Sequence, residues 1–128
     1  MQAALVVFLG AGLGGALRHG VNLFVAWMLG TSFPVATLVI NVSGSLLMGL
    51  FAGYFALKGD PGQMWRLFLT TGVLGGYTTF STFSLDAALL WERGTHGLAI
   101  LYVFGSVMAS IGALFFGLWV VRTQLFLW

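Results

Sequence analysis

Long apolar runs that carry almost no charge dominate this sequence and decide what it can fold into. Charged residues make up 6% and hydrophobic residues 59% of the 128 residues, and the mean hydropathy is +1.02. A soluble domain carries roughly 25% charged residues, so this chain has too few to cover a surface that faces water. A helix needs about 20 apolar residues to cross a bilayer. The sequence therefore predicts a small integral membrane protein with room for four spans.

We expect an all-α protein with four transmembrane helices. Transmembrane strands would alternate apolar and polar residues over about ten positions, whereas the apolar runs here are continuous. Pro34 suits the first turn of a helix, and the segment 58–63 is the clearest turn in the sequence. All four helices belong to one predicted domain, residues 1–128. The predicted helices cover about 3–29, 35–57, 64–91 and 98–121.

The start of the chain predicts a first span and not a signal peptide, because no basic residue precedes it and apolar sequence continues past any plausible cleavage site. With four spans, both termini lie on the same side of the membrane. Lys58, Arg66 and Arg122 fall on that side, against Arg93 and, less certainly placed, Arg18. This basic excess is too small to fix one orientation by the positive-inside rule. The chain is thus compatible with insertion in both orientations.

Small residues recur every four positions in the first and last predicted helices. Such stripes let helix backbones approach closely in lipid. Packing within one chain is the favoured interpretation, and contact between subunits is compatible with it. The stripes are Gly10 and Gly14, followed by Arg18, and Gly105, Ala109, Ala113 and Gly117.

Polar side chains line one face of the second helix and one face of the fourth, at positions i, i+4 and i+8. A single Ser or Thr in a span usually bonds back to its own helix. A buried amide, however, must find partners or face a wet cavity. We predict a polar conduit, with hydrogen bonds between helices as the alternative. The two stripes are Thr37, Asn41 and Ser45, and Tyr102, Ser106 and Ser110.

The third predicted helix contains the run "TTFSTFS", residues 78–84, which packs five hydroxyl side chains and two phenylalanines into a membrane span. Gly72, Gly75 and Gly76 precede the run and are expected to weaken the helix. A helix broken at membrane depth must be buried in protein or line water. The half-helices then expose carbonyl and amide groups that can hold ions. We therefore predict a functional break near residues 75–79.

After the break, the side chains predict an anion path. Thr79, Thr82 and Asp86 share one helix face, and Phe80 and Phe83 project from a neighbouring strip. An aromatic ring has a positive edge, which favours an anion, and neighbouring hydroxyls donate hydrogen bonds to it. This combination suits a small anion that must shed water without binding too tightly.

Other patterns exclude several classes of protein. The segment "GAGLGG" matches a dinucleotide-binding fingerprint formally, but it lacks the preceding strand and the later acidic residue. No nucleophile, base and orienting acid come together, so we do not expect an enzyme. His19 and His96 are too far apart to predict a metal site, and the absence of cysteine excludes disulfides and thiolate sites. A net charge of +2 spread over five basic residues does not indicate nucleic-acid binding.

Three segments resemble the small fluoride channels of the Fluc (CrcB-type) family. They are "GAGLGGALR", "TLVINVSGSLLMG" and above all "GVLGGYTTFSTFSLD". The likeness runs in register from about residue 10 to 110. It implies an antiparallel, dual-topology homodimer in the bacterial inner membrane, surrounded by lipid, with two pores through which toxic fluoride leaves the cell passively.

The resemblance also assigns roles to individual residues. The pore asparagine of the family falls on Asn41, and its pore phenylalanines fall on Phe80 and Phe83. Arg18 falls near the pore entrance, where the residues alone leave two interpretations, snorkelling to the interface or supplying positive potential. The remaining matches to the polar track are Ser81, Thr82, Thr37, Tyr102, Ser106 and Ser110.

Two further expectations follow from the resemblance. The family holds a structural sodium ion (Na+) at the dimer centre through main-chain carbonyls, which correspond to Gly75 and Thr78. Two carbonyls from each subunit would form an oxygen cage that suits a hard cation. In the family the acidic position after the second phenylalanine is usually glutamate, and here it is Asp86. The aspartate side chain is one methylene shorter, so it is open whether its carboxylate reaches as far along the polar track.

The main alternative is a small multidrug-type exporter coupled to protons, which also uses four helices in an antiparallel dimer. That chemistry needs a membrane-embedded carboxylate to exchange protons for a cationic substrate. The first predicted helix has no acidic residue and carries Arg18, which argues against cation binding. A structural subunit without transport would not need the aligned hydroxyl stripes.

Overall fold

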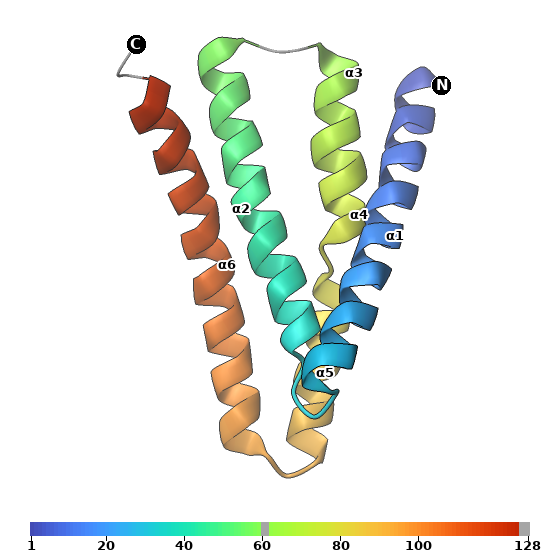
Figure 1. The fold of residues 1–128 in the computed structure, drawn as a ribbon, viewed down its shortest axis with the longest axis vertical. Helices are drawn as coiled ribbons and strands as arrows, with labels where there is room; N and C mark the ends of the chain where they lie inside the picture. Colours follow the sequence, from blue (N-terminus) through green and yellow to red (C-terminus); the bar gives the residue numbers. More distant parts are fainter. Residues whose placement is uncertain (60–61, 126–128) are drawn as a thin grey trace.

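The structure is a computed structural model that describes residues 1–59 and 62–125, and within them every regular element is a helix. Three long helices, α1 (Gln2–Leu29), α2 (Val35–Lys58) and α6 (His96–Leu125), form three arms of the molecule (Figure 1). Each is long and apolar enough to cross a membrane. The predicted turn over 58–63 lies partly outside the described residues. The chain is thus an all-helical, multi-pass membrane protein.

The fourth arm is interrupted, as the run "TTFSTFS" predicts. It begins with α3 (Gln63–Arg66), continues as the π-helix η1 (Leu67–Leu74) and α4 (Gly75–Tyr77), and resumes as α5 (Phe80–Glu92). Between α4 and α5, Thr78 has φ −76° and ψ 157°, and Thr79 has φ −150° and ψ 116°, which is extended backbone. The break thus consists of two residues, at the end of the expected 75–79 window.

Two of the three glycines before the break, Gly72 and Gly76, serve close packing with α1, and the expectation that the glycines weaken the helix stays a prediction. Gly75 and Gly76 are helical, and Gly72 lies within η1. A Cβ on Gly72 would lie 2.9 Å from the Gly10 Cα, and one on Gly76 would lie 2.8 Å from the Ala11 Cα. These positions therefore let α1 contact η1 and α4 backbone to backbone, as small-residue stripes do in membranes.

The two ends of the small-residue stripe on α6 differ in whether they contact another helix of the chain. A Cβ on Gly117 would lie 2.6 Å from the carbonyl oxygen of Leu46, so α6 packs closely on α2 there. A Cβ on Gly105 would meet no atom within 4 Å. Packing within the chain therefore accounts for one end of this stripe, and the other end is open.

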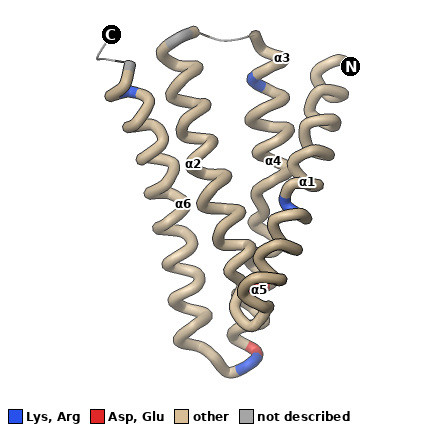
Figure 2. The backbone as a smooth tube through the Cα atoms, in the orientation of Figure 1, with Lys and Arg blue, Asp and Glu red and all other residues tan. Residues whose placement is uncertain are grey.

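The arms pack in two pairs, α2 with α6 and α1 with η1 and α4, while α5 packs against α6 near the end opposite the termini (Figure 1). A small buried cluster of Phe83, Leu90, Ala99 and Tyr102 holds α5 to α6. The basic residues of α3 and α6 lie near the end with both termini, and the charges at the end of α5 lie at the opposite end (Figure 2). The α1 arginine lies between the two ends.

Candidate functional site

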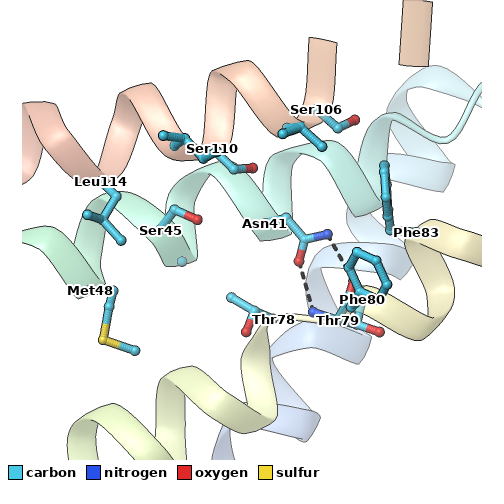
Figure 3. Close-up of a pocket in the computed structure, with 13 residues that line it drawn as sticks. Asn41, Ser45, Met48, Thr78, Thr79, Phe80, Phe83, Ser106, Ser110 and Leu114 are labelled. Carbon is cyan, nitrogen blue, oxygen red and sulfur yellow. Dashed lines mark hydrogen bonds between the residues drawn. The ribbon is translucent and has the colours of Figure 1, made fainter. Parts of the chain in front are cut away.

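Asn41 on α2 holds the break in place with both ends of its side-chain amide. Its Nδ2 donates a hydrogen bond of 2.9 Å to the Thr79 carbonyl, and its Oδ1 accepts one of 2.8 Å from the Thr79 amide (Figure 3). An amide at membrane depth needs such partners. The Thr79 amide and carbonyl, which the break takes out of the helix, supply them. The Asn41 side chain and the Thr79 backbone therefore satisfy each other's hydrogen bonds.

The break also redirects two backbone amides that would serve the carbonyls of Gly75 and Thr78 in an unbroken helix. In an unbroken helix the carbonyl of residue i accepts from the amide of residue i+4. The Thr79 amide, which would serve Gly75, donates instead to Asn41 Oδ1. The Thr82 amide, which would serve Thr78, donates 3.2 Å to Thr79 Oγ1 and so caps α5. These are the two carbonyls that the family resemblance connects with sodium.

One pocket of about 350 Å³ lies between the break, α2 and α6, and we call it the uncharged pocket because none of its lining residues is charged. Figure 3 shows hydroxyl and amide side chains from α2 and α6 facing the phenylalanines of α5. This arrangement brings five of the predicted anion-path residues together. They are Asn41, Phe80, Phe83, Ser106 and Ser110, joined by Ser45, Thr78 and Thr79.

A second pocket, of about 360 Å³, lies nearer the end with the α5–α6 loop, and we call it the charged pocket. Its lining includes Asp86 and Arg93, together with the predicted residues Thr37 and Thr82. Thr37 Oγ1 donates a hydrogen bond of 2.6 Å to Asp86 Oδ2, and the Tyr102 hydroxyl donates to the same oxygen over 3.2 Å. Despite its shorter side chain, Asp86 reaches both the second helix and the last.

Buried side chains separate the two pockets and connect them by hydrogen bonds. Thr79 lines the uncharged pocket and Thr82 the charged one, and the Thr79 hydroxyl donates 3.0 Å to that of Thr82. Phe83 packs on Tyr102 with ring centroids 5.3 Å apart, and Thr37 is buried beside them. A hydrogen bond between hydroxyls therefore connects the linings of the two pockets, and the Tyr102 hydroxyl bonds to the Asp86 carboxylate of the charged pocket.

The two phenylalanines are not equivalent, although their spacing predicts a shared role. Phe83 is 8% exposed and belongs to the buried cluster, whereas Phe80 is 78% exposed at the start of α5. Their ring centroids lie 5.5 Å apart, and both line the uncharged pocket. The Phe83 ring is thus fixed by packing within the chain, whereas most of the Phe80 ring is exposed.

Arg18 and Ser81 line neither pocket, and Ser106 lines the uncharged pocket without a hydrogen bond to any described residue. Arg18 is half-buried on α1 and lines neither pocket. Ser81 is exposed and also outside both, with its hydroxyl 3.3 Å from that of Thr79. Ser106 faces the uncharged pocket, and its buried Oγ has no hydrogen-bond partner among the residues that the structure describes.

Sequence reasoning overlooked Asn22 and Arg93, which line the charged pocket. Asn22 lies in a predicted span, and the cost of burying an amide, which drew attention to Asn41, applies to it equally. The position of Arg93 in a polar loop gave no comparable signal. Among the described residues, no three His, Cys, Asp or Glu side chains gather as metal ligands.

Comparison with known proteins points to one family over almost the whole chain. The model of the CrcB-like protein family, also described as camphor resistance (CrcB), matches residues 5–118. A Methylobacterium nodulans protein named fluoride-specific ion channel FluC is 62% identical over 122 residues, which are 95% of this chain and 98% of that protein. A Rhodopseudomonas palustris protein of the same name is 64% identical over 118 residues, or 92% of this chain and 95% of that protein.

Proposed function

The chain belongs to the CrcB-like protein family, and on this basis we propose that it is a fluoride-selective channel that lets cytoplasmic fluoride leave the cell passively. Such a channel protects the cell from fluoride toxicity and is not an enzyme. The uncharged pocket is the observation that carries the proposal. Its hydroxyl and amide donors and its aromatic edges offer a small anion many weak contacts without a fixed positive charge.

The donors of this pocket suit conduction because permeation requires binding that is strong enough to admit the ion and weak enough to release it. Fluoride would pass Asn41 and the phenylalanine rings, and the hydroxyls of Ser106 and Ser110 would replace part of its hydration shell. From there it would move past Tyr102 toward the charged pocket. The resemblance adds Ser81 and Arg18 to this path, and these two remain predictions.

We propose further that the working channel is an antiparallel, dual-topology homodimer in the inner membrane, with the broken arm over residues 63–92 as a fourth span. Two observations support this. Phe80 is 78% exposed on a single chain although it lines the pocket, and a second copy packed there would enclose the ion. The basic residues near the two ends of the molecule also give only a weak bias for one orientation.

A structural sodium ion is part of the proposal, and the residues present fit it. The amides that would serve the Gly75 and Thr78 carbonyls in an unbroken helix donate instead to the side chains of Asn41 and Thr79. Two such carbonyls from each of two subunits supply the hard oxygen ligands that a hard cation prefers. The bound ion would neutralise the carbonyl dipoles at the break and hold the two subunits together.

Passive efflux from liposomes tests the proposed function. Purified protein is reconstituted into vesicles loaded with potassium fluoride, valinomycin is added so that potassium balances the charge, and release is followed with a fluoride electrode in the absence of a proton gradient. A channel releases fluoride at once, and an imposed pH gradient leaves its permeability unchanged. Release that requires a proton gradient would favour the multidrug-type exporter, and no release from well-folded protein would refute the channel.

A further inference from the structure

A second polar contact holds the break, apart from both pockets. The hydroxyl oxygens of Ser43 on α2 and Tyr77 on α4 lie 2.9 Å apart, and both residues are half-buried. The Ser43 hydroxyl also donates to the Ile40 carbonyl over 3.2 Å. When the Ser43 proton lies in that bond, the Ser43 oxygen accepts the proton of Tyr77. Neither side chain lines either pocket, so the anion path does not account for the pair.

With this contact, α2 makes hydrogen bonds to the residues on both sides of Thr78. Tyr77 is the last residue of α4 and immediately precedes the break, whereas Thr79, which Asn41 holds, is its second residue. The Tyr77 ring also lies across Gly44, where a Cβ would come 3.2 Å from its Cδ1 and would overlap the Thr78 side chain. One helix thus fixes the residue before Thr78 and the residue after it.

From this geometry we infer that Ser43 and Tyr77 are positioning residues for the Thr78 carbonyl, which they hold at the place where it contributes to the sodium site. The inference rests on the sodium site of the proposed function. A cage of backbone oxygens selects its cation through the placement of those oxygens, and a site needs its ligands held within about 0.5 Å. The Thr78 amide and hydroxyl both donate to the Leu74 carbonyl within the same arm, over 3.0 and 2.9 Å. Without the Tyr77–Ser43 bond, α2 would hold the neighbours of Thr78 from the Asn41 side alone.

The test measures sodium affinity through stability and not through transport. The thermal unfolding midpoint (Tm) of the purified protein is recorded at rising sodium concentration, with N-methylglucamine keeping the ionic strength constant. Sodium that binds the folded protein raises the Tm by mass action. Tyr77→Phe keeps the ring over Gly44, and Ser43→Ala removes the acceptor. We expect each to raise the half-saturating sodium concentration about threefold or more, as the loss of one hydrogen bond does.

Two comparisons make the test specific. The double variant should need no more sodium than the weaker single variant, because both changes remove the same bond. Tyr54→Phe removes a hydroxyl from α2 about three turns away, on a residue that is 49% exposed, and should leave the sodium dependence unchanged.

Two results would overturn the inference. If Tyr77→Phe and Ser43→Ala lower the Tm equally at every sodium concentration, the pair is merely structural. If the wild-type protein shows no sodium-specific rise in Tm, the sodium site fails and the inference fails with it. Fluoride efflux by the same wild-type preparation then shows separately whether the channel function survives.

Discussion

The uncharged and charged pockets have nearly the same volume, about 350 and 360 Å³, but they are built from different chemistry. The first combines aromatic edges with neutral donors from α2, the break and α6. The second contains a carboxylate and a guanidinium, and its Asp86 already accepts two hydrogen bonds from neighbouring residues. The difference teaches that the uncharged pocket can offer an anion many weak contacts, whereas the charged pocket presents it with a carboxylate and a guanidinium. We therefore assign selection to the uncharged pocket.

Asn41→Asp should produce the largest effect, because it places a carboxylate in the uncharged pocket. The new side chain repels an anion and can no longer donate to the Thr79 carbonyl. Together these effects should raise the free-energy barrier to fluoride passage by roughly 3 kcal/mol or more. Fluoride efflux should therefore fall about 100-fold or further. Efflux from liposomes measures it.

Asn22→Asp is the matched control, since it makes the same chemical change in the pocket that already contains Asp86. We expect a smaller loss of efflux for this variant. An equal or larger loss at Asn22 would remove the distinction between the two pockets.

The two phenylalanines should separate transport from stability. Phe83→Ile and Phe80→Ile both remove an aromatic edge from the uncharged pocket and should slow fluoride efflux while the oligomeric state of the protein stays as in the wild type. Phe83 is buried against Tyr102, so its replacement should also cost roughly 1–3 kcal/mol of stability. Phe80 is 78% exposed on a single chain, so the packing within that chain that its replacement removes should be worth less than about 0.5 kcal/mol.

Efflux, thermal unfolding and size-exclusion chromatography of both variants check this prediction. Wild-type efflux in both would contradict a role for the aromatic edges. A large loss of stability in Phe80→Ile would instead show that a partner subunit buries this ring as tightly as the chain buries Phe83.

Ser106→Ala should have the smallest effect of the series. The buried Ser106 hydroxyl has no partner within the described part of the chain, so its removal breaks no hydrogen bond there. Stability should stay the same or rise by up to about 1 kcal/mol. Fluoride efflux should fall about threefold through the loss of one donor. Thermal unfolding and efflux together decide this, because a loss of stability would mean that the hydroxyl serves the fold.

Much of this architecture could be predicted because membrane helices depend on local sequence. Apolar run length predicted α1, α2 and α6 closely, and the hydroxyl run located the break. The packing role of Gly72 and Gly76 could not be predicted from sequence, since it depends on α1 lying against η1 and α4. The position of Gly72 beside Gly10 is a tertiary fact.

Helical spacing could group polar residues by helix face but could not show how those faces meet. It placed Asn41 on one face of the second helix and Ser106 and Ser110 on one face of the last, and one pocket contains all three. The same spacing treated Phe80 and Phe83 alike, because it took no account of how the break leaves Phe80 at an open helix start. The pairing of Asn41 with Thr79 also required two distant segments to meet, which no local pattern reports.

The fluoride-to-chloride permeability ratio tests the assignment of selection most directly. It should be measured in liposomes for the wild-type protein, Phe83→Ile and Asp86→Asn, the last of which removes the charge but keeps an acceptor for Thr37 and Tyr102. We expect Phe83→Ile to lower the ratio and Asp86→Asn to keep it near the wild-type value. A ratio that falls in Asp86→Asn and persists in Phe83→Ile would contradict the account and assign selection to the charged pocket.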